Sequence, residues 1–216
     1  MEANIILAGV GGQGILSISL VIDMAAVKQG LSFKQAEVHG MSQRGGAVQS
    51  HLRISGGTIY SDLVPKGRGT LVLAIEPLES LRYVEYLSPD GAVVSGVDPF
   101  VNIPNYPDVA GVLDAVASLP RSILVPAEKL ARKAGNARAQ NMVLLGAASP
   151  YIGLREEVLE DCIRIAFERK GQKIQDINVA AFRAGRDAGR AYLKHRTSGA
   201  RLDETLALVC GSTHGA

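Results

Sequence analysis

Residues 4–14, Asn4-Ile5-Ile6-Leu7-Ala8-Gly9-Val10-Gly11-Gly12-Gln13-Gly14, decide the fold of this chain. A continuous apolar run that ends in glycine is typical of a strand buried on both faces of a parallel sheet. The apolar residues from Ile15 to about Gln29 recur at helical spacing, and Gly30 stands where a helix C-cap belongs. Strand, glycine turn and helix together predict the opening of a βαβ unit.

The turn carries glycines at 9, 11 and 14 in GxGxxG spacing, with Gly12 as a fourth. Glycine allows positive φ and close approach of a ligand to the backbone, and N–H groups at a helix start can hold a phosphate or carboxylate. An ordinary NAD site needs an acid about 20 residues further on, ending the second strand. Glu37 is the nearest acid, but His39-Gly40 follows it and the chain turns antiparallel there. An anionic or nucleotide-like ligand, a purely structural turn and an NAD(P) site all remain open.

Further strands follow from the apolar patterning. Residues 32–38 are extended, and residues 48–54 alternate at period two, which predicts an antiparallel or edge strand with His51 on its solvent side. Ser55-Gly56-Gly57-Thr58 predicts a tight hairpin turn into residues 59–61. Buried strands are expected at 70–75, 92–95 and 122–125, with helical segments after 77 and at 107–119.

From residue 126 onward the chain is predicted to be helical. A buried helix at 136–148 should be broken by Ser149-Pro150, and helices at 155–169 and 178–193 follow. The fold class is therefore α/β: one Rossmann-like domain over residues 1–193, with a mixed, mostly parallel sheet, an antiparallel hairpin insertion and a helical C-terminal third. Residues 194–216 are expected to be a tail that is mobile or docks on a partner.

Composition narrows the function. Two cysteines far apart, Cys162 and Cys210, exclude a disulfide framework, a four-cysteine zinc site and an iron–sulfur cluster carried by this chain alone. The formal net charge of +2 comes without a basic tract, so no nucleic-acid partner is expected. The absence of a long apolar run or a signal-peptide start predicts a cytoplasmic protein that does not enter the membrane.

A second loop, His39-Gly40-Met41-Ser42-Gln43-Arg44-Gly45-Gly46, is polar and glycine-rich. The flanking glycines suit Arg44 to reach an anion, because they let the backbone approach as well. His39 alone is a weak signal, since a loop histidine is more often a solvated bystander. Cys162 is expected in the core and Cys210 in the tail, and a carboxylate site at Asp62 and Glu76 has no supporting partner.

Taken together, residues 9–14 and 36–48 resemble the small, gamma-type subunit of the 2-oxoacid:ferredoxin oxidoreductases. The form His-Gly-Met-Ser-Gln-Arg-Gly-Gly is similar to the indolepyruvate (aryl-pyruvate) branch, and Asn141-Met142-Val143-Leu144-Leu145-Gly146-Ala147 looks like the buried helix of this family. The resemblance implies a partner subunit that carries thiamine diphosphate, magnesium and [4Fe-4S] clusters and decarboxylates the 2-oxoacid. The acyl group would pass to coenzyme A and the electrons to ferredoxin, while this chain completes the active site and handles coenzyme A.

Under that resemblance, residues Gly9, Gly11, Gly12, Gln13, Gly14 and Gly45 are the candidates for binding the anionic cofactor. Ser42, Gln43 and Arg44 are expected to contact the ligand or the partner's active-site mouth, and His39 to face the substrate or brace the loop. A plug at the subunit interface is the structural alternative for this loop. Arg183, Arg186 and Arg190 either meet coenzyme A phosphates or ferredoxin, or are solvated. No metal site is expected, and a stand-alone NAD(P)- or anion-binding protein, or a family member with another 2-oxoacid, stays open.

Overall fold

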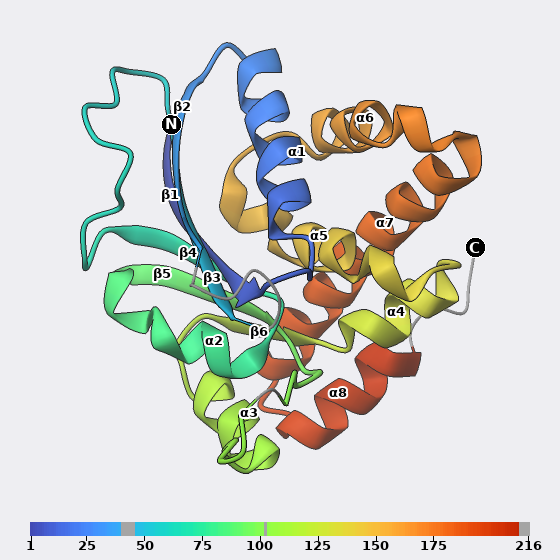
Figure 1. The fold of residues 1–216 in the computed structure, drawn as a ribbon. Coiled ribbons are helices and arrows are strands. Elements are labelled where there is room, and N and C mark those ends of the chain that lie inside the picture. Colours follow the sequence, from blue (N-terminus) through green and yellow to red (C-terminus); the bar gives the residue numbers. More distant parts are fainter. Residues whose placement is uncertain (40–45, 102, 212–216) are drawn as a thin grey trace.

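The computed structural model describes residues 1–39, 46–101 and 103–211 (Figure 1). In these ranges one six-stranded sheet has the order β2-β3-β1-β4-β5-β6. Its strands are β1 (Glu2–Val10), β2 (Ser32–His39), β3 (Ala47–Ser55), β4 (Gly69–Ala74), β5 (Leu87–Gly96) and β6 (Ser122–Val125). β1, β4, β5 and β6 run parallel, and β3 pairs antiparallel with both β1 and β2. The mixed, mostly parallel sheet with an inserted antiparallel hairpin is thus confirmed.

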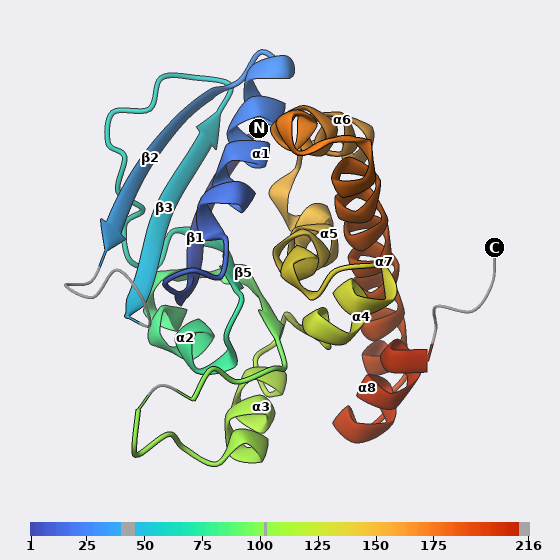
Figure 2. The ribbon, with the colours of Figure 1, turned by 45° about the vertical axis from the view of Figure 1, so that its right-hand side comes forward.

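Helices cover both faces of the sheet (Figures 1 and 2). α2 and α3 contact one face, while α1 and α5 contact the other, with α7 packed against α5. The helices and short 3₁₀ turns (η) are α1 (Ile15–Lys28), α2 (Pro77–Arg82), η1 (Val84–Tyr86), α3 (Val109–Ala117), α4 (Ala127–Lys133), η2 (Ala137–Ala139), α5 (Gln140–Ile152), α6 (Glu156–Ala166), η3 (Glu168–Lys170), α7 (Gln172–Thr197) and α8 (Leu202–Gly211).

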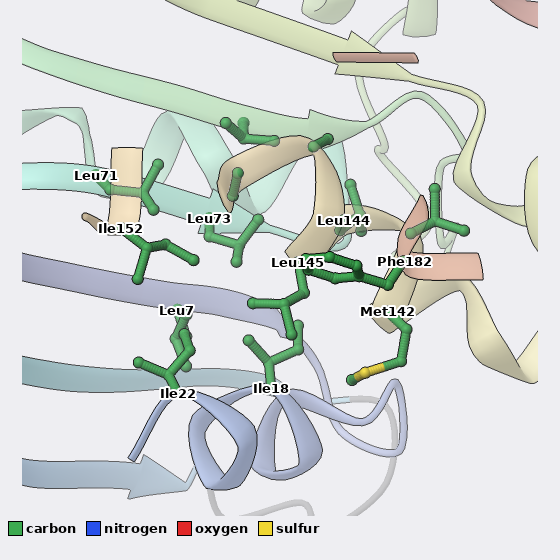
Figure 3. Packing of buried hydrophobic residues seen from close by; sticks show 14 of the residues in the cluster. Leu7, Ile18, Ile22, Leu71, Leu73, Met142, Leu144, Leu145, Ile152 and Phe182 are labelled. Carbon is green, nitrogen blue, oxygen red and sulfur yellow. The ribbon is translucent and has the colours of Figure 1, made fainter. Parts of the chain in front are cut away.

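Buried apolar side chains pack between the sheet and the α1/α5 layer (Figure 3). Leu7 of β1 and Leu73 of β4 face Ile18 and Ile22 of α1 and Leu145 of α5, and all five side chains are at most 1% exposed. β1 is apolar on both faces because helices cover both, which is why its sequence does not alternate. Its rigid placement fixes where the glycine turn emerges.

α5 and α7 run in the same direction and touch at backbone distance. A Cβ atom on Gly146 of α5 would lie 1.9 Å from the Phe182 carbonyl oxygen, and one on Gly185 of α7 would lie 1.8 Å from that of Val143. Both positions must therefore be glycine for the helices to approach so closely. The contact holds the N-terminus of α5 against the glycine turn.

One predicted hairpin is wrong. Residues 56–68 do not form a strand after Ser55; they pass as a loop over the outer face of β3. His51 on that face is only 4% exposed, accepts a hydrogen bond from the Val64 backbone N–H at Nδ1 (3.1 Å) and stacks edge-on against Tyr86. The prediction of a solvent-facing His51 is wrong for the same reason, since a covering loop leaves no mark on the period-two pattern.

The predicted break at Ser149-Pro150 is also wrong, because α5 continues to Ile152. Pro150 lies in the last turn of α5, where the loss of its one backbone N–H donor does not interrupt the rest of the helix. Gly153, with φ 78°, ends the helix instead. The boundary predicted at residue 193 falls inside α7, which runs to Thr197, and α8 packs on α7 (Figure 2). In the described part of the chain, no helix is both long and apolar enough to cross a membrane.

Candidate functional site

The glycine turn leaves the carboxyl end of β1 and enters α1 through two left-handed residues, Gly12 (φ 97°) and Gly14 (φ 90°). Gln13 stabilises the turn through two hydrogen bonds to Val10. The Gln13 Oε1 accepts a hydrogen bond from the Val10 N–H (2.8 Å), and the Gln13 backbone N–H donates to the Val10 carbonyl (3.1 Å). A Cβ atom on Gly12 would meet nothing within 4 Å. The exposed Gly12 is therefore where a ligand can approach the backbone.

Gly9 and Gly14 also shape the turn, because a side chain at either position would collide with the protein. A Cβ atom on Gly9 would lie 2.8 Å from Gln13 Oε1, and one on Gly14 would lie 2.7 Å from Asn141 Nδ2. Asn141 is 5% exposed and its Nδ2 donates to the Gly14 carbonyl (3.2 Å). These two predicted binding glycines thus shape the turn, and Asn141 ties it to α5.

The two sequence motifs meet at one edge of the sheet. Val10 pairs with Ala47, and the Gly11 N–H donates to the Gly46 carbonyl (2.9 Å), so the end of the second loop adjoins the glycine turn. His39 is the last residue of β2 and pairs with Val48. Four predicted site residues, Ser42, Gln43, Arg44 and Gly45, lie outside the described residues.

A cleft of about 510 Å³ opens beside the glycine turn, a size that suits a small ligand. Gly12, Gln13, Gly14 and Ser17 form one wall, and residues of η2, α5, η3 and α7 form the rest. Two of these residues, Arg138 and Lys170, are cations, and no carboxylate is among the lining residues. Lys170 Nζ lies 5.2 Å from the centre of the Phe167 ring. This cleft combines the open backbone of Gly12 with two positive charges and therefore suits an anion.

Sequence reasoning missed Arg138 and Lys170 as site residues. They lie more than 120 positions after the glycine turn, on short 3₁₀ segments whose place depends on the packing of α5 and α7. The sequence shows that 16 of the 23 Lys and Arg residues follow residue 120, but this uneven distribution does not say which of them converge.

The geometry disfavours an ordinary NAD site. Glu37 lies on β2, and β3 stands between β2 and β1. Strand spacing of about 4.8 Å puts β2 roughly 10 Å from β1, whereas in a dinucleotide fold the acid-bearing strand is next to the glycine strand.

The other candidates have structural partners. Arg183 donates to both carboxylate oxygens of Glu160, and Arg190 to Glu156, so these arginines pair α7 with α6. Arg183 and its neighbouring arginines lower the pKa of Glu160. Arg183 and Arg190 are thus exposed to solvent, as one of the two alternatives expects, and they also form ion pairs between α7 and α6.

Cys162 and Glu76 also fit structural roles. Cys162 is fully buried, and burial raises the pKa of its thiol, which disfavours the reactive thiolate. Glu76 is 1% exposed and caps α2 through the Glu79 N–H (2.8 Å) while also accepting a hydrogen bond from the Tyr106 hydroxyl. Within the described ranges, no group of three or more His, Cys, Asp and Glu side chains could hold a metal ion.

Comparison with known proteins identifies the family. Residues 4–188 match the family model described as pyruvate ferredoxin/flavodoxin oxidoreductase. The chain is 36% identical over 206 residues to indolepyruvate oxidoreductase subunit IorB of Thermococcus kodakarensis, covering 89% of this chain and 98% of that protein. It is 37% identical over 194 residues to the subunit of the same name from Archaeoglobus fulgidus, covering 86% and 94%.

A solved structure shares the fold. The 2-oxoglutarate:ferredoxin oxidoreductase from Magnetococcus marinus, with 2-oxoglutarate, coenzyme A and succinyl-CoA bound, matches with a TM-score of 0.70 and 23% identity over 88% of this chain and 31% of that chain. The family match spans most of the sequence, including both loops and the α5 helix that the resemblance rested on. The chain therefore belongs to the pyruvate ferredoxin/flavodoxin oxidoreductase family.

Proposed function

We propose that this chain is the subunit of an indolepyruvate, or aryl-pyruvate, ferredoxin oxidoreductase that completes the active site and binds coenzyme A. The substrate class is supported by the names of relatives that are 36–37% identical over most of their length. The partner would carry thiamine diphosphate, magnesium and [4Fe-4S] clusters, decarboxylate the 2-oxoacid and pass electrons to ferredoxin. The complex would be cytoplasmic.

The observation that carries the coenzyme A assignment is the cleft beside Gly12. Coenzyme A is a polyanion, and the cleft offers an open glycine backbone at a helix start with Arg138 and Lys170 opposite. The M. marinus enzyme, which shares this fold, was solved with coenzyme A bound. In our proposal, residues Gly12–Gly14 and the two cations hold the phosphates, while Ser42, Gln43 and Arg44 lie toward the partner's active site and His39 braces their loop or faces the substrate.

Reconstitution tests the proposal. The chain is co-expressed with a family partner subunit that binds thiamine diphosphate, and reduction of a low-potential dye is followed with indolepyruvate and coenzyme A. We expect activity only when both subunits and both substrates are present. If no aryl-pyruvate supported dye reduction and the isolated chain bound NAD(P) tightly, the proposal would be wrong. The chain would then be a stand-alone nucleotide-binding protein. Activity with another 2-oxoacid only would correct the substrate.

The second loop is tested by Arg44→Ala in the reconstituted complex. Loss of a guanidinium that contacts an anionic group should lower turnover by about tenfold or more, because charge-assisted hydrogen bonds are among the stronger polar contacts. Assembly, followed by co-purification, should be intact. Lys66→Ala, which removes an exposed cation paired with Glu85, is the control. Unchanged turnover and coenzyme A dependence would show that Arg44 is not part of the active site.

A further inference from the structure

A second cleft, of about 530 Å³, lies at the other end of the α5–α7 pair. Its walls come from the start of β6, the end of α5 and the end of α7, including Arg121, Ser122, Tyr151 and Arg196. The glycine-turn cleft includes Asn178 of α7, whereas this one includes Leu193 of the same helix. At 1.5 Å per residue, the two sites are about 22 Å apart along α7, so the second cleft is separate from the proposed coenzyme A site.

All charged side chains that line this cleft are positive. Arg121 and Arg196 line it, and no aspartate or glutamate does. Arg121 pairs with Asp90, but that carboxylate is 86% exposed and lies outside the cleft, so the pair is open to solvent. Arg196 uses Nη1 to donate to the Ala200 carbonyl (2.7 Å), which leaves its other N–H groups for a ligand.

Ser122 adds a hydroxyl to the lining of the cleft. It also contacts Tyr192, a tyrosine that is 1% exposed and does not itself line the cleft. Burial raises the pKa of the Tyr192 phenol, while the charge of Arg196 and a side-chain hydrogen bond with Ser122 lower it. The polar groups that a ligand in the cleft can reach therefore include those of Arg121, Ser122 and Arg196.

The rest of the lining is largely apolar. It includes Leu119, Pro120 and Leu193, together with the ring of Tyr151. Burial raises the pKa of the Tyr151 phenol, and the charge of Arg121 lowers it. Two cations together with apolar carbons suit a small molecule with an acidic group and an apolar body. We propose that this cleft binds a small organic anion, with Arg121 and Arg196 holding its acidic group.

The test uses the full-length isolated chain and two probes, benzoate and inorganic phosphate, at constant ionic strength. Calorimetry should show saturable binding of benzoate with a dissociation constant in the millimolar range or tighter, and weaker binding of phosphate, which has no apolar body. Arg196→Gln should weaken benzoate binding about tenfold or more. Arg164→Gln, which removes an exposed arginine paired with Asp176 on another face, and Arg138→Ala, in the first cleft, should leave it unchanged.

Arg121→Gln tests the second cation of the cleft. It should weaken benzoate binding as Arg196→Gln does, because the two arginines hold the same acidic group in the proposal. Absence of saturable binding of both probes to the wild type, or wild-type affinity in both Arg121→Gln and Arg196→Gln, would overturn the proposal. Weaker benzoate binding in Arg138→Ala would instead assign the binding to the first cleft and would also contradict it.

Discussion

At the scale of single residues, α1 contains a carboxyl group, that of Asp23, whose charged form is disfavoured in the folded state. Asp23 lies on α1, its Oδ1 is buried without a hydrogen-bond partner among the described residues, and burial, with Glu37 nearby, raises its pKa to about 7. The folded state therefore retains a proton that the unfolded chain loses near pH 4, so stability attributable to Asp23 falls as pH rises from about 4 to 7.

Asp23→Asn removes this titration. Because the side chain is partly exposed, solvent screening reduces the effect, and we expect the free energy of unfolding at pH 8 to rise by about 1 kcal/mol. The gain should shrink toward pH 4 and disappear below about pH 3, where the wild-type carboxyl is protonated in both states. Urea unfolding at several pH values measures it. A variant that is equally less stable at every pH would show that the carboxylate is needed in the fold.

Some residues of the candidate site could be predicted from the sequence, and others could not. Gly12, with its open backbone, could be predicted because a GxGxxG turn between a strand and a helix has a local pattern. Arg138 and Lys170 could not, because their convergence on the turn depends on long-range helix packing. Gly9 and Gly14 were singled out from the same turn; a Cβ atom on either would meet Gln13 or Asn141, although Gly14 also lines the cleft.

At the scale of elements, the α5–α7 contact is the feature most sensitive to one methyl group. Gly146→Ala would place a carbon 1.9 Å from the Phe182 carbonyl oxygen, so the helices must separate and the core around them must repack. We expect a loss of about 3 kcal/mol or more in the free energy of unfolding, or no soluble protein. Because α5 carries Asn141, the glycine turn should also loosen.

Gly111→Ala in α3 is the matched control. Its Cβ would lie 3.6 Å from Asp108 Oδ2, an ordinary contact, and alanine favours helix over glycine. This variant should be as stable as the wild type or more so by about 0.5–1 kcal/mol in thermal or urea unfolding. If Gly146→Ala matched Gly111→Ala, the two helices would not be held at backbone distance.

The strands that could be predicted were those whose burial follows directly from the pattern of apolar residues in their own sequence. β1, β4 and β6 are apolar runs buried on both faces, and β3 alternates because its two sides differ. The failed hairpin at residues 55–61 and the solvent side assigned to His51 share a cause, since the loop over β3 is placed by tertiary contacts such as Val64 to His51. The Pro150 error arose because a rule for helix interiors was applied in a last turn.

At the scale of the whole molecule, the fold brings two loops and a basic cleft to the carboxyl edge of one sheet. β1 and β4 are adjacent and parallel, and their connections leave toward opposite ends of the sheet order, a topology at which α/β proteins bind ligands. Family membership and this placement support our proposal that the chain is a subunit whose cleft holds coenzyme A for a partner's active site.

The measurement that tests this account most directly is the KM for coenzyme A of the reconstituted complex carrying Arg138→Ala and Lys170→Ala together. The account predicts an increase of about tenfold or more, because two cations facing the phosphates are lost, with the KM for indolepyruvate and the yield of complex unchanged. Lys129→Ala with Arg132→Ala, two exposed cations of α4 outside the cleft, is the charge-matched control. An unchanged KM for coenzyme A, or an equal increase in the control, would contradict the account.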